Sequence, residues 1–94
     1  MPQNTATVSS VNASATAVTL FAAGAGNDAA ARMIFNDSTA DVYVKFGATA
    51  SATDFTVKIS AGGYYEAPVP VYDGLITGIW TSATGAARLT QVDA

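Results

Sequence analysis

The stretch VYVKFGATASATDFTVKI, residues 42–59, contains two five-residue runs in which apolar and polar side chains alternate. This period of two is typical of half-buried strands, because successive side chains of a strand point to opposite faces. We therefore expect residues 42–46 and 55–59 to pair as an antiparallel hairpin. The core-facing side of this hairpin would consist of Val42, Val44, Phe46, Phe55, Val57 and Ile59.

The opposite face of the hairpin carries Tyr43, Lys45, Thr56 and Lys58, and so holds two of the four cationic residues of the chain. If the protein docks by this face, Lys45 and Lys58 should meet acidic groups of the partner. Reversing both charges should then weaken attachment. If attachment does not change, the hairpin is structural and the docking surface moves to the N-terminal arm.

Shorter alternating runs separated by turn residues fill the rest of the chain. We expect strands at residues 15–21, 32–35, 64–66, 75–80 and 87–92. Residues 32–59 should form a three-stranded meander with an exposed loop at 47–54, and 28–31 should form a helical turn capped by Asn27 or Asp28. Residues 67–71 contain Pro68 and Pro70, which predict an edge or crossing segment.

Seven or eight short strands without a convincing helix predict an all-β fold, a single small antiparallel β-sandwich or barrel. This domain should comprise residues 15–94. Residues 1–14 are mostly polar, with only Val8 and Val11 as branched apolar anchors. We expect them to form a flexible N-terminal arm, with at most one weak strand, that orders against a partner.

Charged residues make up only 12% of the 94-residue chain, whereas ordinary soluble domains contain about 25%. An exterior of alanine, threonine and serine costs little to desolvate, which favours an oligomer or a protein that lies against another protein. The alternative is a monomer with a hydroxyl-rich surface. The net charge of -3 and four scattered cations argue against nucleic acid as a partner.

The chain contains no histidine and no cysteine, which removes the commonest general base, thiolate chemistry and disulfide bonds. We expect no catalytic residue, no metal site and no cofactor. A calcium site built from turn aspartates and a glycosidase pair that includes Glu66 are the alternatives. The sequence lacks the pattern of a signal peptide or a membrane span, so we expect a soluble protein that folds in a cytoplasm.

Several pieces of the sequence resemble, in order, a group of short structural proteins of tailed bacteriophages. They are FNDSTA from Phe35, VYVKFGATAS from Val42, FTVKI from Phe55, GGYYE from Gly62, GIW from Gly78 and GAARLT from Gly85. The resemblance implies a β-rich virion component of the capsid decoration (cement) or fibre-attachment kind, which acts as a homo-oligomer. It does not imply an enzyme.

From this resemblance we expect a decoration protein that binds and stabilises the phage head, most simply as a homotrimer on the major capsid protein. Its location would be the virion, assembled in the cytoplasm of the bacterial host. The alternative is a phage fibre or tail-tip module that binds host surface glycan through Tyr64, Tyr65, Tyr72 or Trp80. Trp80 is more simply explained as part of the core or of a subunit contact.

Partner-binding candidates are chosen by residue type and by position on a strand. Tyr64 and Tyr65 should point to opposite faces, with one inside and one free to touch a partner. Arg32 and Arg88 are either solvated charges or intersubunit partners of Asp41, Glu66 or Asp93. The full set is Tyr43, Lys45, Lys58, Tyr64, Tyr65, Arg32 and Arg88.

Overall fold

A computed structural model of the protein describes residues 5–24 and 29–93, which form eight strands and no helix. The all-β prediction is therefore confirmed. The strands are β1 (Thr5–Asn12), β2 (Val18–Phe21), β3 (Ala29–Ser38), β4 (Val42–Phe46), β5 (Val57–Ile59), β6 (Tyr64–Glu66), β7 (Ile76–Trp80) and β8 (Gly85–Asp93).

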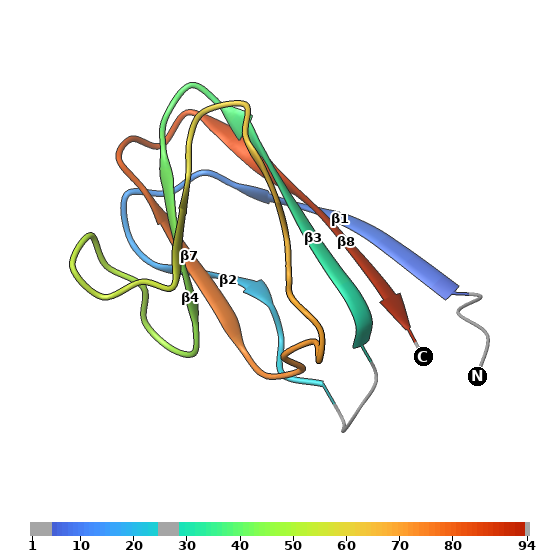
Figure 1. Ribbon diagram of the computed structural model, residues 1–94. Coiled ribbons are helices and arrows are strands. Elements are labelled where there is room, and N and C mark those ends of the chain that lie inside the picture. The colour runs from blue at the N-terminus through green and yellow to red at the C-terminus, as the bar shows by residue number, and fades with distance from the viewer. Residues whose placement is uncertain (1–4, 25–28, 94) are drawn as a thin grey trace.

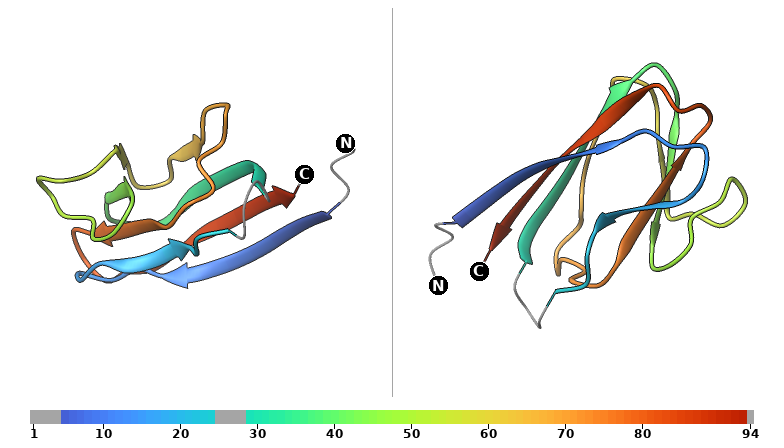
Figure 2. Two further views of the ribbon diagram at one scale, coloured as in Figure 1. Left: turned by 90° about the horizontal axis from the view of Figure 1, so that it is seen from below. Right: turned by 180° about the vertical axis from the view of Figure 1, so that it is seen from behind.

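The strands form two four-stranded antiparallel sheets, one in the order β1-β8-β3-β6 and the other in the order β2-β7-β4-β5 (Figure 1, Figure 2). Each of the first four strands pairs with its counterpart from the far end of the chain: β1 with β8, β2 with β7, β3 with β6 and β4 with β5. The chain therefore runs as one long hairpin that folds into two layers. This is the topology of a jelly roll.

The core between the sheets is small and is built from side chains of both layers. Ile34 and Leu89 come from one sheet, and Val42, Val44 and Trp80 come from the other. Their burial follows the period of two expected for strands. Trp80 is 2% exposed, which confirms its assignment to the core.

The hairpin of residues 42–59 is confirmed for β4 and β5, where Val42 pairs with Ile59 and Tyr43 with Lys58. The expectation that Phe55 lies on the core-facing side is wrong, because this residue lies before β5 and is 40% exposed. Its ring packs on Tyr43, with centroids 4.8 Å apart, on the face opposite to the one we expected. The strand is too short at its start to direct this ring into the core.

The predicted three-stranded meander is wrong, because β3 and β4 belong to different sheets. The chain crosses from one layer to the other between Ser38 and Val42. Asn36 holds this corner: its Nδ2 donates to the carbonyl oxygens of Ala40, Ile59 and Ser60 at 2.8, 3.0 and 3.1 Å. A turn that continued the same sheet would not bring these carbonyl groups around one amide.

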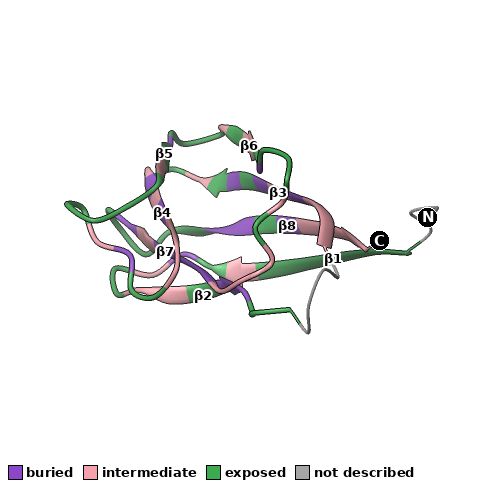
Figure 3. Cartoon of the chain, turned by 60° about the horizontal axis from the view of Figure 1, so that its bottom comes forward, coloured by how far each residue is buried: buried purple, intermediate pink, exposed green. Residues whose placement is uncertain are grey.

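The N-terminal arm is also corrected for the part that the structure describes. Instead of a frayed segment, Thr5–Asn12 is an eight-residue strand paired with β8 along its whole length. Nearly all of β1 is exposed, since it lies at the edge of its sheet (Figure 3). The ladder to β8 orders these residues although their side chains bury little apolar surface.

Two smaller expectations also change. Residues 29–31 open β3 and are not helical, while the proposed caps Asn27 and Asp28 lie outside the described residues. The loop at 47–54 is anchored to the sheet: Ala50 is buried, and its backbone N–H donates to Oγ1 of Thr77 at 3.0 Å. Residues 67–71 contain no strand, in agreement with the predicted crossing segment.

Candidate interaction surface

The solvent side of the β1-β8-β3-β6 sheet presents two rows of side chains that cross all four strands. Strand register places Ser10, Arg88, Phe35 and Tyr64 in one row, and Val8, Thr90, Met33 and Glu66 in the next. Their neighbours on the opposite side, Ile34 and Leu89, are buried in the core. We call these eight residues the outer face.

Large apolar side chains are unusually exposed on the outer face. Val8 is 72% exposed, Tyr64 is 58% exposed and Phe35 is 40% exposed. Phe35 and Tyr64 lie directly opposite each other on β3 and β6, on the same side of the sheet. Exposed aromatic side chains of this kind are typical anchors of protein interfaces.

The arginine of the outer face is engaged within the chain. Arg88 Nε donates to Oδ2 of Asp37 at 3.0 Å and its Nη1 donates to Oγ of Ser10 at 2.9 Å. This arginine therefore links β1, β8 and β3 from the solvent side. As a partner-binding candidate it lies beside Phe35, and part of its guanidinium is already engaged.

Glu66 ends the second row and lies beside Tyr64. The hydroxyl of Tyr64 donates to Oε1 of Glu66 at 3.3 Å. Partial desolvation of the hydroxyl, followed by the charge and the hydrogen bond of Glu66, raises the pKa of Tyr64 above its usual value. Glu66 lies on an open sheet, so it does not have the enclosed setting that a glycosidase carboxylate needs.

The other predicted surface, on the β4–β5 hairpin, carries little free charge. Lys45 Nζ lies 2.6 Å from Oδ2 of Asp54, and Lys58 Nζ lies 3.5 Å from Oδ2 of Asp41. Lys58 also lies over the ring of Tyr43, 5.7 Å from its centroid. Each lysine therefore already has a carboxylate of its own chain. That Lys45 and Lys58 also meet acidic groups of a partner stays a prediction.

All four cations of the chain are paired in the same way, because Arg32 and Arg88 contact Asp73 and Asp37. Four of the seven acidic residues take part in these ion pairs, namely Asp37, Asp41, Asp54 and Asp73. Of the others, Asp28 lies outside the described residues, and Glu66 is on the outer face. On the hairpin, the charges of Lys45 and Lys58 are balanced by Asp54 and Asp41.

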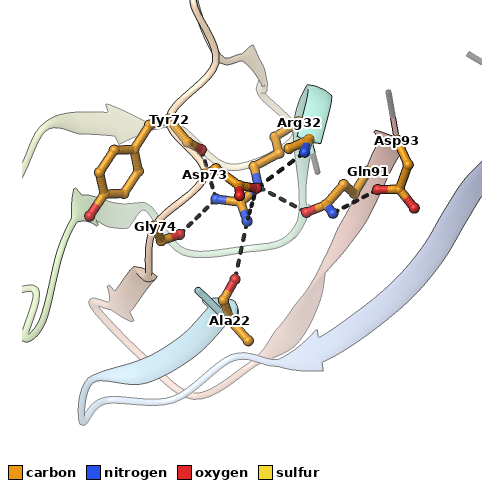
Figure 4. A network of polar contacts seen from close by, with 8 residues as sticks. Ala22, Arg32, Tyr72, Asp73, Gly74, Gln91 and Asp93 are labelled. Carbon is orange, nitrogen blue, oxygen red and sulfur yellow. Dashed lines mark hydrogen bonds and ion pairs between the residues drawn. The ribbon is translucent and has the colours of Figure 1, made fainter. Parts of the chain in front are cut away.

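Arg32 is a correction, since it is neither a solvated charge nor available to a partner subunit. Its side chain is 1% exposed, and the guanidinium donates to the carbonyl oxygens of Ala22, Tyr72 and Gly74 (Figure 4). Nε donates to Oε1 of Gln91 at 2.9 Å. Instead of Asp41, Glu66 or Asp93, the carboxylate at its side is Asp73, at 3.7 Å.

The role of the Arg32 cluster is structural. It joins β3 and β8 to the loops that follow β2 and precede β7, and Arg32 lies 4.9 Å from the centroid of Phe21. Burial lowers the pKa of the guanidinium, and the negative charge of Asp73 opposes this shift. The sequence contained no signal for this cluster, because its acceptors are mainly backbone carbonyl groups.

The remaining aromatic candidates divide as strand geometry predicts. Tyr65 points away from Tyr64 and packs edge-on against Phe46, with centroids 6.5 Å apart. The ring of Tyr72 stacks on the ring of Phe46, with centroids 5.1 Å apart. Of the two neighbouring tyrosines, one is thus inside and one is free, and only Tyr64 belongs to the outer face.

A pocket of about 330 Å³ lies between the inner side of β1 and the end of β2. Thr7, Ser9, Phe21 and Gln91 line part of it. The Gln91 amide is already committed, since it accepts from Arg32 and donates to Asp93. The remaining polar side chains of the lining are the hydroxyls of Thr7 and Ser9.

Across residues 5–24 and 29–93, no cluster of three or more acidic residues is placed to hold a metal ion. The same part of the chain has no helix of the length and apolarity that crossing a bilayer requires. Searches of protein-family models, curated proteins and solved structures found no match to this chain.

Proposed function

We propose that this chain is a structural protein of a tailed-phage virion, a decoration protein that binds and stabilises the capsid as a homo-oligomer. The resemblance of residues 35–91 to short phage structural proteins motivates this function. Jelly rolls serve as viral capsid domains but also as lectins and cupins, so the fold is compatible with the proposal and does not select it.

The outer face is the observation that carries the proposal. It combines exposed Phe35 and Tyr64 with a cation, Arg88, that is already paired within the chain. Such a surface can be desolvated against another protein without stranding an unpaired cation. The major capsid protein is the proposed partner, the virion is the proposed location, and assembly takes place in the cytoplasm of the bacterial host.

The mechanism is contact and not chemistry. Phe35 and Tyr64 would insert against the capsid surface, and burial of their rings would supply most of the binding free energy. Binding across neighbouring capsid subunits would then oppose their separation under internal pressure. The contribution of Lys45 and Lys58 should be small, because partner carboxylates would have to compete with Asp54 and Asp41.

The test is co-sedimentation of the purified protein with phage heads that lack it. Phe35→Ser and Tyr64→Ser should each weaken binding about tenfold or more, which corresponds to about 1.4 kcal/mol or more. Phe55→Ser is the matched control, because Phe55 has the same 40% exposure as Phe35 but lies beside Tyr43 of the other sheet.

The wild-type protein and the Phe55→Ser variant should remain with the heads. A wild-type protein that does not bind heads would overturn the proposed function. Equal loss of binding in the Phe35→Ser and Phe55→Ser variants would instead overturn the assignment of the outer face. Circular dichroism of each variant separates lost binding from lost folding.

A fibre or tail-tip module that binds glycan is the second candidate, and the exposed Tyr64 ring beside the Glu66 carboxylate favours it. A sugar could stack on this ring and donate a hydrogen bond to this carboxylate. Trp80 and Tyr65 do not contribute, since both face the interior. A glycan array with Tyr64→Ala as the negative control tests this function, and no signal from the wild-type protein removes it.

A further inference from the structure

β1 is the longest edge strand in the described structure. It ends its sheet, and seven of its eight residues are exposed (Figure 1, Figure 3). The other edge strands are shorter: β6 and β5 have three residues each, and β2 has four.

The register identifies which backbone groups point outward from this edge. The N–H of Ala13 donates to the carbonyl oxygen of Gly85 at 2.9 Å, at the point where the β1–β8 ladder ends. Bonding to a neighbouring strand alternates from residue to residue in an antiparallel ladder. The amide and carbonyl groups of Ala6, Val8, Ser10 and Asn12 therefore point away from β8.

The pairing of β8 with β3, on the other side of β8, leads to the same assignment of outward-pointing backbone groups on β1. The N–H of Asn36 donates to the carbonyl oxygen of Gly63, so Asn36 bonds toward β6 and not toward its partner Ala87. Ala87 consequently bonds to Val11 on the other side. Val11 thus faces β8 with its backbone, and its neighbours face the open edge.

This edge carries none of the features that protect strand edges in natural proteins. The β1 sequence, TATVSSVN, contains no charged residue and no proline. Natural edge strands are usually short, or carry lysine, proline or a bulge, which prevent pairing with another chain. Two copies of β1 can therefore approach each other without placing like charges in opposition.

We propose that β1 pairs antiparallel with β1 of a second copy of this chain, around a two-fold axis, so that the β1-β8-β3-β6 sheets of both copies become one. We choose a second β1 as the pairing strand because of the length of the β1 edge. A head-to-tail contact with β6 of a neighbour would match three residues and leave five of the eight unpaired. Pairing with another β1 engages Ala6, Val8 and Ser10 of each copy through an isologous contact.

The proposed register places Val8 opposite Val8 of the second copy. Ala6 then pairs with Ser10, and these pairs together form about six hydrogen bonds, two for each hydrogen-bonded pair. The register also covers Val8, which is the most exposed apolar residue of the outer face. The contact gives a dimer and not the homotrimer that we expected, and it does not depend on capsid binding.

The test is the solution mass of the full chain, measured by light scattering or sedimentation equilibrium. The wild-type protein should have twice the 9.5 kDa chain mass. Val8→Lys and Val8→Glu should each be monomeric, because the register brings two like charges together. A mixture of the two variants should restore a particle of the dimer mass, since the charges facing each other are then opposite.

Val69→Lys is the matched control, because Val69 is 87% exposed in the crossing segment outside the strands and carries the same substitution. This variant should remain dimeric. A monomeric or trimeric wild-type protein would overturn the inference, as would Val8→Lys and Val8→Glu variants that both stay dimeric. Monomeric variants whose mixture stays monomeric would exclude the Val8–Val8 register. Capsid co-sedimentation is read separately, so the proposed function can fail while the dimer stands.

Discussion

The indole Nε1 of Trp80 donates a hydrogen bond to Oδ1 of Asn36 at 3.1 Å, between β7 of one sheet and β3 of the other. Both side chains are buried, and the Asn36 amide also binds three backbone carbonyl oxygens. A polar contact thus links the two layers inside the molecule, where Arg32 and Thr77 are also buried among the described residues. Every polar group at this point has a partner within the network.

Replacing Asn36 with alanine should lower the free energy of unfolding by about 3 kcal/mol, since it leaves the Trp80 N–H and several carbonyl oxygens buried without partners. Chemical denaturation followed by tryptophan fluorescence measures this change. Asn12→Ala, at an exposed asparagine, should change it by less than about 0.5 kcal/mol. Equal effects at both positions would show that the Asn36 network contributes little.

Replacing Arg32 with methionine should lower the free energy of unfolding by about 3 kcal/mol, because Asp73 and the carbonyl oxygens around the guanidinium lose their donor. Arg88→Met is the matched control. Its ion pair with Asp37 is about half exposed on both sides, so its loss should cost about 1 kcal/mol or less. A larger effect at Arg88 than at Arg32 would contradict the structural role assigned to the cluster.

Replacing Gly85 with alanine should destabilise the fold more than replacing Gly62. Both glycines have positive φ, +94° for Gly85 and +76° for Gly62. A Cβ at Gly85 would lie 2.6 Å from the carbonyl oxygen of Asp37, whereas a Cβ at Gly62 would meet nothing within 4 Å. Gly62→Ala should therefore cost about 1–2 kcal/mol for conformation alone. In thermal unfolding, the melting temperature of the Gly85→Ala variant should lie well below that of the Gly62→Ala variant.

Replacing Glu66 with glutamine should lower the pKa of Tyr64 toward its ordinary value, because it removes the nearby negative charge. Part of the upward shift should remain, since partial desolvation of the hydroxyl is its largest cause. Absorbance titration, with Tyr64→Phe to assign the signal, measures the change. An unchanged pKa in the Glu66→Gln variant would contradict the contact between these side chains.

The direction of the shift also determines how this contact depends on pH. The folded pKa of Tyr64 lies above its unfolded value, so the folded state retains this proton more strongly. The stabilisation of the folded state that follows from this shift is complete below the pKa of the unfolded state. It is lost as the pH rises through the pKa of the folded state. The difference in the free energy of unfolding between the wild-type protein and the Tyr64→Phe variant should therefore decrease as the pH rises through the alkaline range.

Reversing Lys45 and Lys58 to glutamate should change head binding by less than about threefold, which is well below the effect of Phe35→Ser. Lys45 is partly buried and pairs with Asp54, Lys58 is exposed and pairs with Asp41, and neither lies on the outer face. Co-sedimentation of the double variant measures this. A strong loss of binding by a folded double variant would return the docking surface to the hairpin.

Local pattern predicted the elements well wherever a strand buries one face. Alternation placed β4, β5 and β7 near their observed bounds, and it separated Tyr64 from Tyr65. It failed where the apolar alternation extends beyond the end of the strand. Phe55 continues the apolar alternation of β5 but precedes the strand, and its ring therefore packs on Tyr43.

The candidate site was only partly predictable. Tyr64 and Arg88 do lie on the outer face, but Phe35 and Val8 join it only through strand register. The sequence offers no way to see that Arg32 is buried, because its partners are carbonyl oxygens from segments far apart in the chain. The lysines kept their predicted face, and nearby aspartates neutralise them.

By itself, the sequence determined the all-β class, the turn positions and the face of most side chains, because these depend on neighbours one or two residues away. The tertiary structure decided which strands pair, since β1 meets β8 and β3 leaves β4 for the other sheet. Pairing across about eighty residues reflects the burial of both sheets against one core, which no local pattern encodes. That pairing creates both the outer face and the open edge of β1.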